Sequence, residues 1–138
     1  VEVSSELRTE KTAELASKFA MIGSLRESLL VRQQRFKELP GLVADGRDMG
    51  TVVFKDASFK VFLTANVEER AKRRLKQLQD KGIAGNISDT LDEVKKRDER
   101  DATRKHSPLK PAKDALIIDT SYLTVNDVVT KVMTLVKV

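Results

Sequence analysis

Two short segments of the sequence gather charged residues at spacings that could support chemistry. The first, residues 45–48, reads Asp-Gly-Arg-Asp and directly follows a short apolar run at residues 42–44. A buried strand that ends in a carboxylate is typical of a Walker B segment, in which the acid holds magnesium directly or through water. Asp45 is therefore a candidate magnesium-side carboxylate. A simpler interpretation stays open, in which Asp45 and Asp48 are turn residues paired with nearby arginines.

The second segment lies on a strongly charged helix that we expect over residues 88–104. Four of its charged residues follow one another at i, i+3, i+4 and i+7: Arg97, Arg100, Asp101 and Arg104. They therefore share one face of the helix, and such a face is often only solvated surface. The Pro-containing loop expected at residues 105–114 favours a different hypothesis, a lid whose guanidinium groups close over phosphates and exclude water.

Other basic and glycine-containing stretches are less informative. Residues 41–47 superficially imitate the GxxxxGK pattern of a phosphate-cradling loop. Arg47 replaces the lysine, Asp48 replaces the Ser or Thr, and an apolar run occupies the place of the loop, so we reject that interpretation. The basic residues within 70–76 fit a basic outer face as well as they fit a phosphate contact. No triphosphate cradle is recognisable in the sequence.

Composition narrows the classes of ligand. The 138 residues include no cysteine and one histidine, which excludes disulfides and thiolate zinc sites and leaves oxygen ligands for any metal. The formal net charge of +5 favours an anionic partner. Five Phe and one Tyr do not interleave with basic residues, which favours free nucleotides over single-stranded nucleic acid. No signal peptide or membrane-length apolar run is visible, so the cytoplasm is the expected compartment.

Hydrophobic periodicity predicts helices and strands in alternation. The expected helices cover residues 9–22, 24–38, 66–81, 88–104 and 125–136, and the expected strands cover residues 42–44, 60–65 and 115–119. The expected N-terminal caps of the helices are Thr9, Ser24, Asn66 and Thr124. Strands that alternate with helices predict parallel pairing in a single α/β domain. A sheet of three short strands is thin, which indicates that neighbouring strands are absent.

Taken together, several of these segments resemble the bacterial cytidylate kinases. The longest is the block LPGLVADGRDMGTVVF at residues 39–54, and the likeness continues at residues 68–74, 97–101 and 114–120. It covers essentially the whole chain and implies a three-layer P-loop NTPase core of the nucleoside monophosphate kinase type, with a parallel sheet. That core is incomplete here, because the family's N-terminal GxxxxGK[ST] segment has no counterpart in the sequence.

The resemblance implies a division of labour within one domain, residues 1–138. Residues 1–39 would form a helical pair on the CMP side, residues 40–87 and 115–138 the core, and residues 88–114 the lid. In that arrangement Arg26 and Asp48 would read the cytosine. Cytosine offers an amino donor for a carboxylate and two acceptors for a guanidinium, whereas uracil would leave the carboxylate unpaired.

Further site residues follow from the same resemblance. The acceptor phosphate and the charge on the transferring group fall to two catalytic candidates, Arg47 and Arg104. ATP would bind near Arg73, with Mg²⁺ as cofactor and Asp45 on the metal side. The sugar hydroxyls fall to Ser17, Arg97 and Asp101.

The expected activity of the parent protein is transfer of the ATP γ-phosphoryl group to CMP or dCMP. A cytoplasmic monomer would achieve it with Mg²⁺ and positioned arginines, without a covalent intermediate, and with neither nucleic acid nor a membrane as partner. Residues 1–138 alone are expected to be inactive, because the phosphate-cradling loop and its lysine are missing. Two alternatives stay open: a non-catalytic nucleotide- or nucleic-acid-binding fragment, and a structural or dimerisation fragment.

Overall fold

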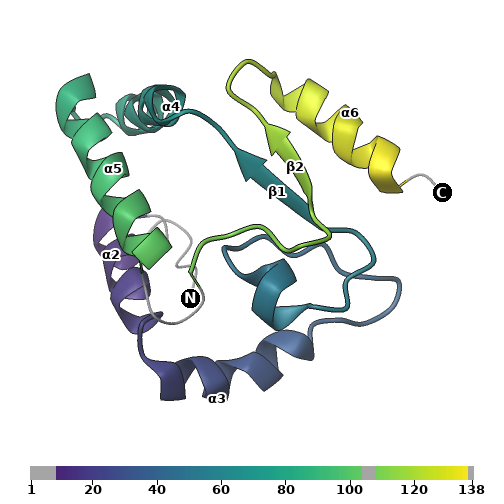
Figure 1. The fold of residues 1–138 in the computed structure, drawn as a ribbon. Coiled ribbons are helices and arrows are strands. Elements are labelled where there is room, and N and C mark those ends of the chain that lie inside the picture. The colour runs from purple at the N-terminus through teal and green to yellow at the C-terminus, as the bar shows by residue number, and fades with distance from the viewer. Residues whose placement is uncertain (1–8, 104–107, 137–138) are drawn as a thin grey trace.

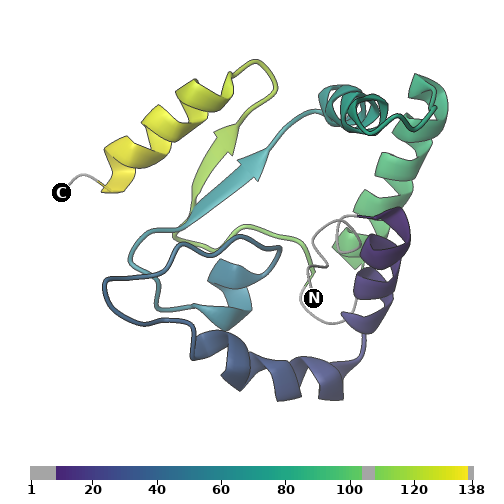
Figure 2. The same cartoon turned by 180° about the vertical axis from the view of Figure 1, so that it is seen from behind.

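The chain is an arrangement of helices around a small parallel sheet, seen in a computed structural model that describes residues 9–103 and 108–136 (Figure 1). In chain order the elements are α2 (Glu10–Phe19), α3 (Gly23–Gln34), the π-helix η1 (Met49–Val53), β1 (Val61–Thr64), α4 (Val67–Asp80), α5 (Ile87–Thr103), β2 (Leu116–Asp119) and α6 (Val125–Val136). Helix α6 lies beside the strands on one side of the molecule, and α2 and α5 lie on the opposite side (Figures 1 and 2).

Two of the three expected strands form, and they pair in parallel. Val61 of β1 lies opposite Leu116 of β2, and the crossover between the two strands contains α4 and α5. The strand predicted at residues 42–44 is wrong, because these residues are irregular and exposed. An apolar run needs a neighbouring strand for its backbone groups, and the described part of the chain gives this run none. The α/β class is confirmed, while the larger three-layer P-loop core stays a prediction.

Side-chain caps fix the starts of three helices where the sequence predicts them. Thr9 caps α2, and the Asn66 side-chain oxygen accepts a hydrogen bond from Glu69 N at the start of α4 (2.7 Å). At α6 the bonds are reciprocal, since Thr124 Oγ1 accepts from Asp127 N (3.2 Å) and Asp127 Oδ2 accepts from Thr124 N (2.9 Å). Each bond satisfies an amide that the helix itself leaves without a partner. Short-range chemistry therefore places these helices correctly.

The expected cap at Ser24 is wrong. Helix α3 begins at Gly23 with Ile22 as its flanking residue, and no side chain caps it. Ser24 consequently lies inside the first turn, where its carbonyl oxygen accepts a hydrogen bond from Ser28 Oγ (2.9 Å). The helix also ends at Gln34, before the predicted end at residue 38.

The apolar core of the described residues is small, and polar groups are buried beside it. The buried apolar residues are Val53, Phe54, Ala71 and Ile118. The buried polar residues are Asp48, Thr90, Asp101, Thr120 and Ser121. Large apolar side chains of the sheet and α6 remain exposed, among them Leu63, Ile117, Val125 and Val129. No helix within the described ranges is long and apolar enough to cross a bilayer.

Candidate functional site

Arg26 and Asp48 come together at one wall of the site, although 22 positions separate them in the sequence. Arg26 Nη2 and Asp48 Oδ2 form an ion pair, and Asp48 is 8% exposed. Asp48 directly precedes η1, and its carbonyl oxygen accepts hydrogen bonds from Val52 N (2.8 Å) and Val53 N (3.3 Å). The π-turn thus fixes the backbone of Asp48. The ion pair fits the simpler interpretation of Asp48, and it also assembles the two residues assigned to cytosine.

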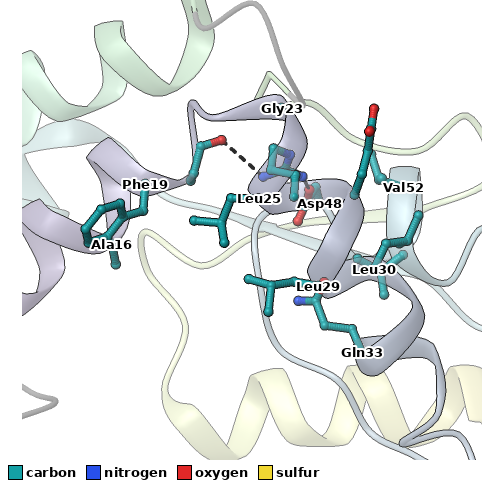
Figure 3. A pocket seen from close by; sticks show the side chains of 13 residues that line it. Ala16, Phe19, Gly23, Leu25, Leu29, Leu30, Gln33, Asp48 and Val52 are labelled. Atoms are coloured by element: carbon teal, nitrogen blue, oxygen red, sulfur yellow. Dashed lines mark hydrogen bonds and ion pairs between the residues drawn. The ribbon is translucent and has the colours of Figure 1, made fainter.

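A cavity of about 510 Å³ opens beside this ion pair, and we call it the base cavity (Figure 3). Its wall is mainly apolar and comes from α2 and α3, including Phe19, Leu25 and Leu29. Arg26 and Asp48 add a charged edge to that wall. Pockets for small organic ligands combine apolar walls with a few polar groups that fix orientation. The base cavity therefore suits a flat ring with polar groups along one edge.

Arg47, one residue before Asp48, faces a different part of the molecule. It forms an ion pair with Asp101 of α5, whose side chain is 3% exposed. The Asp101 carbonyl oxygen also accepts a hydrogen bond from Leu109 N (2.9 Å), so α5 is tied to the segment that follows it. Gly46, just before Arg47, lets the Met49 side chain approach closely, since a Cβ there would lie 2.9 Å from a Met49 side-chain carbon.

A second cavity of about 210 Å³ is lined by two acidic residues, Glu93 and Asp98, and by four arginines: Arg47, Arg70, Arg74 and Arg97. We call these four arginines the arginine cluster. Desolvation, and then the positive charges of Arg74 and Arg100, lower the pKa of Arg97, while Asp98 acts in the opposite direction. Guanidinium groups stay protonated in proteins, so the cluster keeps its positive charge at neutral pH. Several guanidiniums around one cavity favour a phosphate group, which accepts charge-assisted hydrogen bonds from them.

Sequence reasoning does not single out Arg70 or Arg74. Residues 70–76 fit a basic outer face equally well, and the i, i+4 spacing of the two arginines shows only that they share a side of α4. Because α4 packs on α5, this side of α4 lies at the second cavity, and both arginines line it. Arg70 makes a bidentate ion pair with Asp98 of α5, with two nitrogen-to-oxygen distances of 2.6 Å, and these bonds raise the pKa of Arg70.

Arg73 lies at the ends of both strands. Its Nη2 donates to the Thr120 carbonyl oxygen (2.6 Å) and its Nη1 to Thr120 Oγ1 (3.1 Å). Thr120 Oγ1 donates in turn to the Thr64 carbonyl oxygen (3.0 Å), which joins β1, β2 and α4. Ligands of open parallel sheets bind beyond the carboxyl ends of the strands, and this is where Arg73 stands.

The remaining predicted site residues that the structure describes are not among the residues that line the two cavities. Ser17 of α2 is half-buried and is not among the lining residues of either cavity. Asp45 is exposed, and no group of three or more His, Asp or Glu side chains in the described ranges could hold a metal. Magnesium usually takes one or two protein carboxylates and completes its shell with phosphates and water, so Asp45 fits as one such ligand. Arg104 lies outside the described residues.

The fold and these contacts define a class: an α/β protein in which neighbouring residues, Arg47 and Asp48, line an arginine-rich cavity and a mainly apolar cavity with a charged edge. The sequence model of the cytidylate kinase family matches residues 1–138. The chain belongs to the cytidylate kinase family.

Named relatives support the assignment. The chain is 54% identical over 132 residues to the cytidylate kinase of Vibrio parahaemolyticus serotype O3:K6 (strain RIMD 2210633), an alignment that covers 96% of this chain and 58% of that protein. It is 53% identical over 135 residues to the cytidylate kinase of Pasteurella multocida (strain Pm70), with 98% and 60% covered. The cytidylate kinase of Klebsiella pneumoniae (strain 342) is 52% identical, with 96% and 58% covered. The chain therefore spans less than two thirds of the length of these curated relatives.

Proposed function

We propose that this chain supplies the nucleoside monophosphate site and the lid of an enzyme that transfers the ATP γ-phosphoryl group to CMP or dCMP. The observation that carries the proposal is the Arg26–Asp48 ion pair on the wall of the base cavity. In this proposal residues 1–39 are the helical pair on the CMP side, residues 40–87 and 115–138 the core, and residues 88–114 the lid. The products are CDP and dCDP, and the enzyme acts as a cytoplasmic monomer.

The ion pair matches the edge of cytosine. Asp48 has a second carboxylate oxygen beyond the one that Arg26 engages, and it can accept a hydrogen bond from the cytosine amino group. A guanidinium can donate to the cytosine ring nitrogen and carbonyl oxygen. Uracil presents a carbonyl where cytosine has its amino group, so Asp48 would face an acceptor without a proton between them. Selection for cytosine follows from this mismatch.

The phosphate of the same nucleotide reaches the second cavity, where Arg47 binds it. Arg47 and Asp48 are adjacent in the sequence, yet Asp48 lines the base cavity and Arg47 lines the second one. One short stretch of backbone can therefore orient the base and the phosphate of a single CMP. Arg47, with Arg104 from the lid, stabilises the charge on the phosphate and on the transferring group, while Ser17, Arg97 and Asp101 take the sugar.

The ATP side of the site is less complete. Arg73 at the strand ends contacts the bound ATP, and Asp45 supplies one oxygen ligand on the magnesium side. Magnesium bound with ATP neutralises charge on the β and γ phosphates. The chain's own residues orient the acceptor and exclude water, and positioning accounts for most of the catalysis in phosphoryl transfer.

The proposal is tested by removing the cytosine acceptor. The test uses what we call the completed protein, a chimera in which residues 1–138 replace the matching part of the Vibrio parahaemolyticus relative. A buried charged hydrogen bond is worth about 2 to 3 kcal/mol, so Asp48→Ala should lower kcat/KM for CMP on the order of 10² and change that for UMP little. A coupled assay of ADP release measures both substrates.

Lys37→Ala is the matched control, because Lys37 belongs to an exposed ion pair with Asp56 that lines neither cavity. An unchanged CMP to UMP ratio in Asp48→Ala would refute the cytosine assignment. Failure of the chain to bind CMP, with salt-dependent binding of single-stranded nucleic acid instead, would favour the nucleic-acid-binding alternative.

A further inference from the structure

One guanidinium, that of Arg70, joins three parts of the fold. Its Nε donates to the Ala65 carbonyl oxygen at the end of β1 (3.1 Å). Its Nη1 and Nη2 donate to the two carboxylate oxygens of Asp98 on α5, each at 2.6 Å. Arg70 itself belongs to α4. All three nitrogens of this side chain are therefore engaged in holding α4, α5 and the strand end together.

Asp98 stands between residues that the proposed function uses. It directly follows Arg97 and precedes Asp101 by one helical turn, so it shares a face of α5 with Asp101. Asp101 is held in turn by Arg47. Two ion pairs one turn apart thus hold the same stretch of α5, one from α4 and one from the turn beside the base cavity. Helix α5 packs on α4, and Figure 1 shows both on the side of the molecule away from α6.

We propose that the Arg70–Asp98 pair is a positioning latch, which holds α5 where Arg97 and Asp101 face Arg47. This inference rests on the proposed function. Arg70 acts through α5 and not through the phosphate, because its donors are directed at Asp98 and Ala65. A bidentate guanidinium–carboxylate pair fixes both distance and orientation, which a single contact between two flexible side chains does not.

If the pair acted only through its charges, substitutions of the two partners would have opposite effects. Both residues line the second cavity, so loss of the Asp98 charge would leave that cavity more positive and loss of the Arg70 charge would leave it less positive. If charge alone mattered, Asp98→Asn would strengthen the binding of phosphorylated substrates and Arg70→Gln would weaken it. A latch instead requires both substitutions to act in the same direction, since either one breaks the same link.

The test is a double-mutant cycle in the completed protein, with kcat and KM for CMP as the first readout. A partly exposed ion pair of good geometry is worth about 1 kcal/mol, so Arg70→Gln and Asp98→Asn should each lower kcat about fivefold and change KM less than about twofold. The double variant should be no worse than the worse single variant. Asp98→Glu, which keeps the carboxylate, should retain more than half of the activity. Lys37→Ala with Asp56→Asn is the control cycle, on an exposed ion pair far along the chain from α5.

Amide hydrogen exchange of the same variants gives a readout that does not depend on activity. Exchange in the second half of α5 should rise about fivefold in both single variants, and exchange in α6 should not change. Opposite effects of the two substitutions, additive effects, or unaltered exchange in α5 would each overturn the latch. If the completed protein does not phosphorylate CMP, the proposed function fails, while the exchange cycle still decides whether the latch exists.

Discussion

The two sides of this molecule are held together by different means. Around the site, the buried carboxylates of Asp48 and Asp101 each pair with an arginine from a distant segment. On the sheet and α6, in contrast, large apolar side chains remain uncovered, with Ile117 57% exposed and Val125 79% exposed. The site side is thus organised by contacts among the described residues, whereas the sheet side has apolar surface that these residues do not bury.

This contrast separates the contacts that set the geometry of the site from those that stabilise the fold. Ion pairs such as Arg26–Asp48 and Arg70–Asp98 set local geometry, but pairs of this kind add little to overall stability. Burial of apolar surface supplies most of the stability of a domain, and the apolar core of the described residues is small. The described residues thus combine a site held by ion pairs with a small apolar core, and the chain spans 58% of the length of the Vibrio parahaemolyticus relative.

The largest expected effect follows from this contrast. Residues 1–138 alone should show no ATP-dependent CMP phosphorylation, on the order of 10³-fold or more below the completed protein, because they contain no recognisable triphosphate cradle. The same chain should unfold in urea with a shallow transition, since its sheet side is exposed, and the completed protein should unfold cooperatively. Coupled ADP release and circular dichroism in urea measure the two properties. Robust turnover by residues 1–138 would show that the phosphate site has been misplaced.

A second prediction concerns Arg104, a catalytic candidate of the proposed site. Arg104→Ala should lower kcat of the completed protein on the order of 10², with a much smaller change in KM, because its charge meets charge that develops mainly in the transition state. Arg100→Ala is the control, since Arg100 of α5 lowers the pKa of Arg97 but is not assigned to the phosphate. If the two substitutions behave alike, or if only KM moves, these arginines serve as a diffuse positive surface.

A third prediction concerns the exposed apolar side chains of the sheet. In residues 1–138 alone, Ile117→Ser should change the free energy of unfolding by less than about 0.5 kcal/mol, because the side chain is already largely exposed. In the completed protein the same substitution should lower the free energy of unfolding by about 2 kcal/mol, because we expect the relative's part of the chimera to bury this isoleucine side chain. Urea denaturation of both proteins decides the matter. Equal and small effects would mean that this face of β2 stays exposed.

The sequence predicts those parts of the fold that depend on near neighbours. The caps at Thr9, Asn66 and Thr124 need only residues one turn away, and all three are confirmed. The runs at residues 60–65 and 115–119 also become strands, because each provides the other with a partner. The run at residues 42–44 reads in the same way but stays irregular, since strand formation depends on a neighbour that the run itself cannot supply.

The site shows the same division. No spacing rule connects Arg26 to Asp48, and the two are expected at one site only because the chain resembles a known family. Arg70 and Asp98 escape prediction altogether, because their contact depends on how α4 packs on α5. A helical face can be read from periodicity, but the element that it meets cannot.

The smallest expected effect concerns a carboxylate on the sheet side, which is held by neutral donors and not by arginine. Asp119 Oδ1 accepts hydrogen bonds from Ser121 Oγ (2.6 Å) and Ser121 N (2.9 Å), and these bonds lower the pKa of Asp119 below its ordinary value of 3.8. A carboxylate whose pKa is lower in the folded state stabilises that state above its unfolded pKa, and the stabilisation is lost as the pH falls through the folded pKa. Part of the loss of stability of the completed protein below about pH 4 should therefore disappear in Asp119→Asn, compared with the parent by urea denaturation at a series of pH values. Ser121→Ala should remove much of the same acid dependence, because it deletes one of the two donors. If the free energy of unfolding fell equally with pH in the parent and in Asp119→Asn, the bonds to Ser121 would not persist in solution.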